Sequence, residues 1–143
     1  MKTLAIDSLD DLPDAAEAVI DALAGRTVVA FRGEMGAGKT TLIGAILDRL
    51  GSADTVTSPT FALAHEYTHG NISLYHFDMY RVSGFDELYS TGFFDYLEQD
   101  GVLYIEWSEN IESVLPPNTI TVEISRPQEG DDPDLRRILI RRP

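Results

Sequence analysis

The residues whose types and spacing most clearly indicate a binding site form one short run, Gly33-Glu34-Met35-Gly36-Ala37-Gly38-Lys39-Thr40. The run matches the pattern G-x-x-x-x-G-K-[ST]. Glycines let the backbone turn tightly and aim successive N–H groups at phosphate oxygens. The ammonium group of Lys39 can reach the β- and γ-phosphates of a nucleotide, and the hydroxyl of Thr40 can ligate Mg²⁺. The run therefore predicts a phosphate-binding loop.

The segments on either side of this loop have the patterns that such a loop requires. Residues 27–31 form a continuous apolar, β-branched run, which is typical of a strand buried on both faces of a parallel sheet. A helix is predicted from about Lys39, because apolar residues recur at helical spacing up to Leu50. Its N-terminus would add partial positive charge at the phosphates. The strand–loop–helix order therefore predicts nucleotide binding.

Two acidic residues follow predicted buried strands: Asp78 comes after residues 72–77, and Glu106 after residues 102–105. In open α/β sheets the carboxyl ends of such strands face the ligand site. An acid at this place can hold the metal or position water, or it can simply cap a turn or form a salt bridge. Mg²⁺ takes one or two carboxylates and keeps several waters, so both acids suit one site. We predict catalytic roles for Lys39, Asp78 and Glu106.

The remaining apolar patterns complete one α/β domain over residues 1–143, without a linker long enough to divide it. We expect further strands at 2–6, 61–67, 72–77, 102–105, 119–124 and 135–140, and helices at 12–23, 85–97 and 109–115. The last two strands form a predicted antiparallel pair joined by the acidic segment 127–134. The pattern predicts a three-layer P-loop NTPase-like fold with a mixed, mainly parallel central sheet.

The composition limits the class of protein. The chain has 143 residues, 43% of them hydrophobic, and no cysteine, which predicts an apolar core without a disulfide or a thiolate metal site. It lacks a membrane-spanning apolar run and the apolar stretch of a signal peptide, so we expect a cytoplasmic protein. A net charge of −13 argues against autonomous binding to DNA or RNA. The arginines at positions 136, 137, 141 and 142 are expected to form a solvated strand end.

Several further motifs occur together in a specific order. After the phosphate loop and Thr41 come Ser58-Pro59-Thr60-Phe61, His76-Phe77-Asp78-Met79-Tyr80-Arg81, Glu87-Leu88 with Gly92, and Ile105-Glu106-Trp107. In this order and spacing the chain resembles the tRNA threonylcarbamoyladenosine biosynthesis ATPase family (TsaE, also called YjeE). The resemblance extends from about Leu4 to Val122. The phosphate loop alone is generic, whereas the joint occurrence of the other motifs is specific.

The resemblance implies a function and a set of partners. Members of this family are small bacterial ATPases that assist TsaB and TsaD, the pair that transfers threonylcarbamoyl to adenosine in tRNA. The chain would accordingly reach tRNA only through that complex. Its cofactors would be ATP and Mg²⁺, and its hydrolysis would be slow until partners complete the site.

The resemblance also assigns roles to individual residues. Thr40 and Glu106 match the family's Mg²⁺ ligands, and Asp78 matches the aspartate of the H-x-D-x-Y-R motif, with a role toward metal, water or a switch. The nucleotide is expected to contact residues of the loop and, after the first strand, Ser8. The full predicted contact set is Ser8, Glu34, Met35, Gly36, Ala37, Gly38, Lys39, Thr40 and Thr41.

Several other residues near these motifs have more than one interpretation. Residues 58–61 resemble a switch segment that senses the γ-phosphate, or they form an ordinary turn. Trp107 is a partner contact or a lid on the site, or a half-buried core residue. His76 lies two residues before Asp78 and shares its face of the strand, but a core histidine is the favoured interpretation. Arg81 is a weak candidate for an arginine finger.

Two other functions remain open from the sequence. A small-molecule kinase would need an acceptor pocket and an arginine-bearing lid, yet residues 82–100 contain no Arg or Lys. An ATP-dependent binding module would use the bound state and hydrolyse ATP only incidentally. A GTPase is disfavoured, because no guanine-reading N-K-x-D motif occurs.

Overall fold

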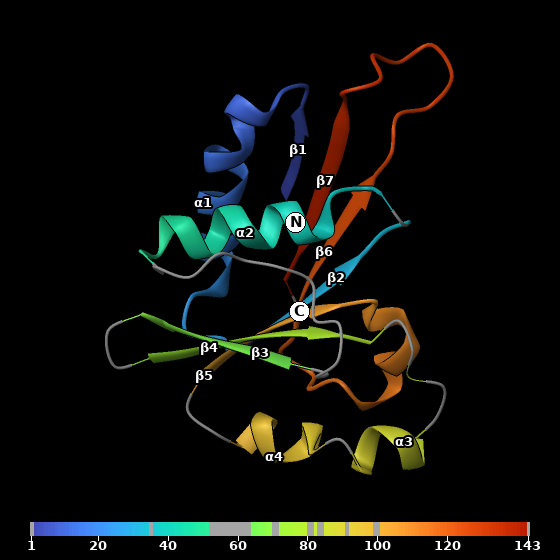
Figure 1. Ribbon diagram of the computed structural model, residues 1–143. Helices are drawn as coiled ribbons and strands as arrows, with labels where there is room; N and C mark the ends of the chain where they lie inside the picture. The colour runs from blue at the N-terminus through green and yellow to red at the C-terminus, as the bar shows by residue number, and fades with distance from the viewer. Residues whose placement is uncertain are drawn as a thin grey trace.

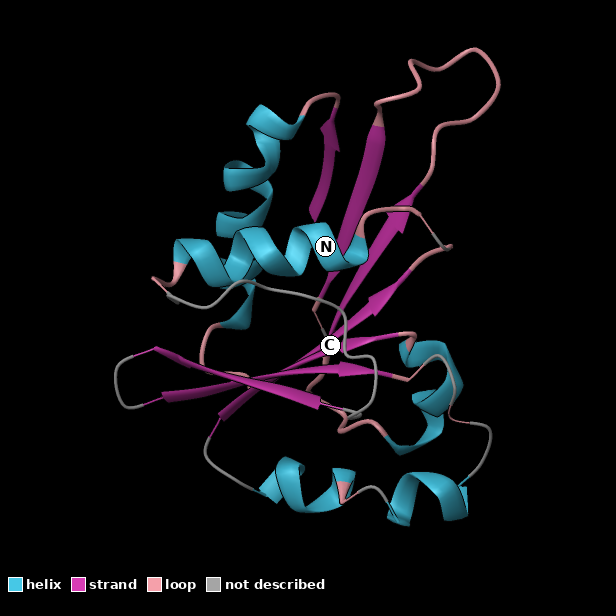
Figure 2. Cartoon of the chain, in the orientation of Figure 1, coloured by secondary structure: helices cyan, strands magenta, loops and turns pink. Residues whose placement is uncertain are grey.

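The structure is a computed structural model that describes residues 2–34, 36–51, 64–69, 72–79, 82, 85–90, 92–98 and 101–142 (Figure 1). The strands of this part of the chain are β1 (Lys2–Ile6), β2 (Val28–Arg32), β3 (Ala64–His69), β4 (Ile72–Asp78), β5 (Gly101–Glu106), β6 (Ile120–Ser125) and β7 (Arg136–Arg141). Its α-helices are α1 (Leu12–Leu23), α2 (Lys39–Arg49), α3 (Phe85–Ser90) and α4 (Phe93–Glu98). Two short 3-10 helices, η1 (Leu9–Asp11) and η2 (Ser108–Val114), complete it (Figure 2).

The strands form one mixed sheet in the order β1-β7-β6-β2-β5-β4-β3. Its four middle strands, β6, β2, β5 and β4, run parallel to their neighbours in that group. The outer pairs are antiparallel: β3 with β4, β6 with β7, and β7 with β1. The predicted α/β fold is therefore confirmed, with a sheet that is parallel in its middle and an antiparallel C-terminal strand pair.

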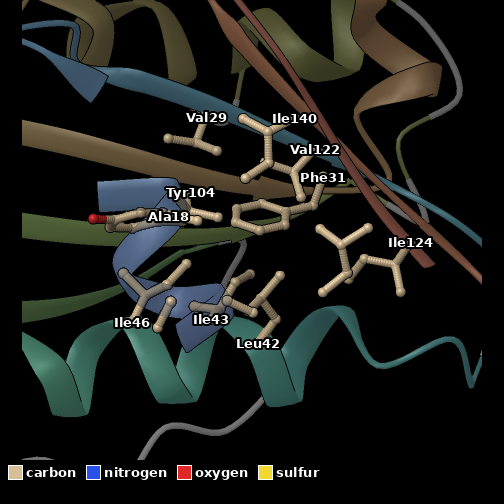
Figure 3. Packing of buried hydrophobic residues seen from close by; sticks show 14 of the residues in the cluster. Ala18, Val29, Phe31, Leu42, Ile43, Ile46, Tyr104, Val122, Ile124 and Ile140 are labelled. Carbon is tan, nitrogen blue, oxygen red and sulfur yellow. The ribbon is translucent and has the colours of Figure 1, made fainter. Parts of the chain in front are cut away.

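Helices cover both faces of the sheet, so the molecule has three layers (Figure 1). One hydrophobic cluster packs α1 and α2 against one face, and a second packs α3, α4 and η2 against the other. Side chains of β2 alternate between the two clusters, because successive residues of a strand point to opposite faces: Val28 joins the second cluster, and Val29 and Phe31 join the first. Figure 3 shows the ring of Phe31 beside Leu42 and Ile43 of α2.

The central position of β2 places its carboxyl end beside those of its neighbours. In the register of the sheet Phe31 of β2 lies opposite Glu106 of β5, which in turn lies opposite Asp78 of β4. The chain then passes from β2 through residues 33–38 into α2. Consequently the loop, the start of α2 and the two strand-end acids meet at one edge of the sheet.

The segments that the structure describes contain no helix with the length and apolar character needed to cross a membrane.

Candidate functional site

The loop between β2 and α2 has the backbone that its glycines predict. Gly36 and Gly38 adopt φ values of 80° and 111°, in the region that side chains disfavour. The amide of Ala37 donates to the carbonyl oxygen of Glu34 at 3.0 Å, which closes a turn. Gly38 caps α2, so the helix begins at Lys39 with its first N–H groups at the loop. These are the features of an anion-binding helix N-terminus.

Gly33 is required for a different reason, which is close approach to a neighbouring strand. A Cβ atom at this position would lie 2.6 Å from the carbonyl oxygen of Ile124 on β6. Since backbone cannot give way as a flexible side chain does, only glycine fits here without a shift of the loop or the strand. The start of the loop is thereby held against β6.

Lys39 is held at the loop by contacts on two sides and is only 4% exposed. Its Nζ donates to the carbonyl oxygen of Gly33 and lies 3.5 Å from the ring centroid of Trp107. Such a cation–π contact stabilises an ammonium group that is removed from water. Burial lowers the pKa of Lys39 below its ordinary value of 10.5, whereas nearby carboxylates act in the opposite direction. They belong to Glu109, Glu106 and Asp78.

The carboxylate of Glu106 is contacted by two other side chains. The hydroxyl of Thr40 lies 2.8 Å from its Oε1 and 3.0 Å from its Oε2, and Nε2 of His76 contacts the same Oε2. Glu106 is 3% exposed and His76 is fully buried. A buried carboxylate needs such partners, because it has lost its hydrogen bonds to water. The structure thus brings together Thr40 and Glu106, the two residues assigned to the metal from the sequence.

Asp78 lies at the same edge of the sheet as Glu106. The two residues are register partners at the ends of β4 and β5, and the amide of Met79 donates to the carbonyl oxygen of Glu106 at 3.0 Å. Asp78 is half-buried and contributes to the field at Lys39. Both acids predicted from strand ends are therefore placed at the loop.

Trp107 follows Glu106 in a left-handed backbone conformation, with φ 58° and ψ 39°. This conformation costs an L-residue on the order of 1–2 kcal/mol, and such strain is concentrated at functional sites. Trp107 is half-buried: its ring contacts Lys39 on one side and packs against the second hydrophobic cluster. The interpretation of Trp107 as a half-buried core residue is therefore confirmed, while its role as a partner contact or a lid on the site stays a prediction.

The oxygen donors present suit Mg²⁺ on chemical grounds. Mg²⁺ prefers oxygen ligands and is usually held by one or two carboxylates together with substrate phosphates and water. Thr40 and Glu106 supply a hydroxyl and a carboxylate that already lie within hydrogen-bond distance of each other. In the described part of the chain, no group of three or more His, Cys, Asp or Glu residues forms a self-sufficient metal site. Thr40 and Glu106 fit a site whose remaining ligands would be phosphate oxygens and water.

A cavity of about 500 Å³ lies against the loop on the side of β1 and the β6–β7 connection. This volume is in the range of small-molecule sites. Five predicted nucleotide contacts line it: Ser8, Gly36, Ala37, Gly38 and Thr41. The structure therefore brings Ser8 to the loop, as expected from the resemblance.

Glu34 belongs to the same loop but does not line this cavity. It is exposed, and it lines a second cavity of about 510 Å³ together with Arg32, Glu109 and Glu123. Met35, the possible switch segment 58–61, and Arg81 lie outside the described residues.

The C-terminal arginines differ from the expectation of a solvated strand end. Nε of Arg136 donates to the carbonyl oxygen of Ala37 at 3.0 Å, so β7 contacts the phosphate loop. Arg142 donates to backbone oxygens of Asp21 and Ala22. The expectation is therefore wrong for Arg136, which also lines the 500 Å³ cavity. Only the approach of β7 to the loop places this residue there.

His76 is fully buried, as the favoured interpretation of a core histidine predicts, and it also contacts Glu106. Its spacing of two from Asp78 was the available signal, because both side chains then point to the same face. The register of β4 with β5 brings that face to Glu106.

The chain is similar in sequence to one protein family over most of its length. Residues 6–137 match the family model described as "Threonylcarbamoyl adenosine biosynthesis protein TsaE". A relative from Haemophilus influenzae, "tRNA threonylcarbamoyladenosine biosynthesis protein TsaE", is 41% identical over 97 residues, which are 68% of this chain and 61% of the relative. A relative of the same name from Bacillus subtilis is 39% identical over 105 residues, 73% of this chain and 64% of the relative.

A relative of that name from Treponema pallidum is 35% identical over 105 residues, which are 73% of this chain and 77% of the relative. The aligned part thus spans less than two thirds of the Haemophilus and Bacillus relatives. Among solved structures, the crystal structure of Bacillus subtilis YdiB matches with a TM-score of 0.61 and 32% identity, and the match covers 96% of this chain and 83% of YdiB.

Proposed function

The chain belongs to the TsaE family of threonylcarbamoyl adenosine biosynthesis proteins, and from this premise we propose that it binds ATP with Mg²⁺ and hydrolyses it. The hydrolysis serves the complex that forms threonylcarbamoyladenosine on tRNA. The observation that carries this proposal is the convergence of Lys39, Thr40 and Glu106 at a glycine-rich loop that leads into the N-terminus of α2.

In this proposal the chain's own groups hold the triphosphate and stabilise charge as the terminal phosphate is transferred to water. Loop amides and the N-terminus of α2 bind phosphate oxygens, and Nζ of Lys39 exchanges its contact with Gly33 for the β- and γ-phosphates. Thr40 and Glu106 would hold Mg²⁺, which would supply positive charge to neutralise the phosphates. Asp78 orients the attacking water or a water of the metal. No covalent intermediate is needed, because charge stabilisation lowers the barrier.

The nucleoside is assigned to the 500 Å³ cavity beside Ser8. Ser8→Tyr fills part of this cavity, so it should weaken ATP binding by about tenfold or more while binding of inorganic tripolyphosphate stays unchanged. Ser8→Ala is the matched control, because it removes the hydroxyl without filling the space. Calorimetry with both ligands tests this, and equal losses for ATP and tripolyphosphate would contradict the assignment.

The partners in this proposal are proteins that resemble TsaB and TsaD, and tRNA is reached only through them. A net charge of −13 supports an indirect role toward tRNA, because an acidic surface repels phosphates. Hydrolysis by the isolated chain is expected to be slow and to rise when the partner pair is added. Steady hydrolysis that the partner pair leaves unchanged would contradict this part of the proposal.

Reconstitution with the partner pair, tRNA, ATP and threonylcarbamoyl donor tests the function as a whole. Mass spectrometry of tRNA nucleosides should show sustained modification with the chain and little without it. Lys39→Ala should abolish the gain. Lys2→Ala is the matched control, because Lys2 is the only other lysine and lies exposed on β1. Modification that is independent of the chain would overturn the proposal.

One variant separates ATP hydrolysis from mere ATP binding. Glu106→Ala removes the carboxylate while leaving the loop and Lys39 in place, so ATP should still bind but turn over at least about tenfold more slowly. If that variant sustains tRNA modification, the chain acts as an ATP-dependent binding module whose hydrolysis is incidental.

A further inference from the structure

We propose that His76 is a positioning residue for Glu106, and that its imidazole fixes the direction of the carboxylate at the metal side of the site. The inference rests on the proposed function, because it concerns the same Mg²⁺ and nucleotide. It adds a residue that acts through Glu106 and touches neither phosphate nor water.

The sheet places the side chain of His76 beside Glu106. On β4 it lies opposite Tyr104 of β5, two pairs before the pair of Asp78 with Glu106. Its side chain therefore points to the same face as Glu106, toward the start of α2, while Tyr75 and Phe77 point into the second hydrophobic cluster. His76 is fully buried, so it cannot exchange this contact for water.

The chemistry of the two groups fixes which atom of His76 acts. Nε2 of His76 contacts Oε2 of Glu106, and because an ionised carboxylate only accepts hydrogen bonds, the proposal assigns the hydrogen to Nε2. The other ring nitrogen, Nδ1, is buried and has no hydrogen-bond partner within the described residues. Packing alone does not require a histidine here, because an apolar side chain would fill the same space without burying polar ring nitrogens.

The contact constrains the carboxylate in a way that matters for a metal. Oε2 of Glu106 is held by His76, and Oε1 lies 2.8 Å from the hydroxyl of Thr40. The hydroxyl of Thr40 also lies 3.0 Å from Oε2, so the contacts of His76 and Thr40 together restrict rotation of the carboxylate. Groups that orient a metal ligand in this way affect metal affinity or activity by about 10- to 100-fold.

Two substitutions that differ in the place of one amide test the proposal. The side-chain amide of His76→Gln can occupy the place of Nε2, whereas that of His76→Asn falls near Nδ1 and cannot reach Glu106. Calorimetry measures ADP affinity with Mg²⁺ and with EDTA. We expect His76→Asn to reduce the gain in affinity due to Mg²⁺ by about 10-fold or more, to leave affinity in EDTA within about twofold, and His76→Gln to restore most of the gain.

A readout without nucleotide or metal tests the contact itself. In ¹⁵N-histidine spectra of the free chain, His76 should show the tautomer with hydrogen on Nε2, and Glu106→Ala should abolish this signature. Equal losses with Mg²⁺ and EDTA, or a Gln variant as defective as the Asn variant, would overturn the proposal, as would hydrogen on Nδ1. If the unsubstituted chain binds no nucleotide, the proposed function fails instead, and the spectra still decide whether His76 orients Glu106.

Discussion

At the level of single side chains, Lys39 is held in place before any phosphate arrives. Its ammonium group lies between the carbonyl oxygen of Gly33 and the ring of Trp107. Because Lys39 is buried, water can hardly replace these partners. An arrangement that is already formed needs little reorganisation when charge develops on a phosphate. The strained backbone of Trp107 is consistent with this role, because it keeps the ring at Lys39.

The emission of Trp107 should report phosphate binding directly, since Trp107 is the only tryptophan of the chain. When ATP draws Nζ of Lys39 toward the phosphates, the cation leaves the face of the ring and the emission changes. A fluorescence titration should therefore show a saturable change. Lys39→Met should remove it, because it keeps the length of the side chain without the charge, and Lys2→Met should retain it. A full response in Lys39→Met would contradict the assignment.

At the level of elements, the phosphate loop is contacted by both strands of the C-terminal antiparallel pair, β6 and β7. Ile124 of β6 approaches Gly33, and Arg136 of β7 donates to Ala37. The hairpin therefore contacts both the beginning of the loop and its turn into α2. This explains why β6 and β7 matter to a site whose predicted residues lie elsewhere.

The close approach of Gly33 to β6 should make this glycine irreplaceable. Gly33→Ala brings a Cβ to 2.6 Å from the carbonyl oxygen of Ile124, so the loop or the strand must shift. We expect a loss of about 1–3 kcal/mol in the free energy of unfolding and a loss of ATP affinity of about tenfold or more. Gly130→Ala is the control, because its φ is also positive but nothing lies within 4 Å of its Cβ. Urea unfolding measures the change in stability, and calorimetry measures ATP affinity. Calorimetry should show normal ATP affinity for Gly130→Ala and not for Gly33→Ala.

An ion pair joins Asp131 of the β6–β7 connection to Arg137 of β7, and its contribution to stability depends on pH. Hydrogen bonds from Arg137 and from the amide of Gln128 lower the pKa of Asp131 below its ordinary value of 3.8. Because the pKa is lower in the folded chain, the stabilisation is complete well above pH 3.8 and is lost as the pH falls through the lowered pKa. Carboxyl ¹³C spectra should therefore give a midpoint below 3.8.

Arg137→Ala should move this midpoint of Asp131 back toward 3.8, because it removes the largest cause of the shift. Arg141→Ala is the matched control, since Arg141 pairs with Glu123 and should leave Asp131 unchanged. An unchanged midpoint in Arg137→Ala would show that the pair does not form in solution.

At the level of the whole molecule, the site lies where the two halves of the fold meet. Lys39 and Thr40 come from α2 on one face of the sheet, and Trp107 packs on the other face. Glu106 and Asp78 come from strands between these layers. A ligand bound at this edge of the sheet would therefore lie beside elements from both layers.

Binding at such a place should stabilise the whole chain. A ligand at 100 times its Kd adds about 2.7 kcal/mol to the free energy of unfolding. We expect Mg²⁺ with ADP to raise Tm by several degrees, EDTA to remove part of this rise, and Lys39→Ala to remove all of it. Differential scanning calorimetry measures these shifts, with Lys2→Ala as the control. An equal rise in Lys39→Ala would show that the nucleotide binds elsewhere.

The parts of the site that could be predicted are those encoded over short stretches of sequence. The loop from Gly33 to Thr40 is contiguous, and both acids are marked by the apolar strands that precede them. The contact of His76 with Glu106 joins residues 30 positions apart, and that of Arg136 with Ala37 joins residues 99 positions apart. Such contacts depend on which strands are neighbours, and a local pattern carries no information about that.

Most of the elements, the α/β class and the phosphate-binding pattern of the loop could therefore be predicted from the residues alone, because backbone propensity, apolar periodicity and residue type act over a few residues. The tertiary structure alone decided that β1 extends the sheet by pairing with β7, that Gly33 must pass close to β6, and that a buried histidine holds Glu106. These features follow from strand order and register, which are set by the packing of the whole chain. A shift of one residue in the register would turn His76 away from Glu106.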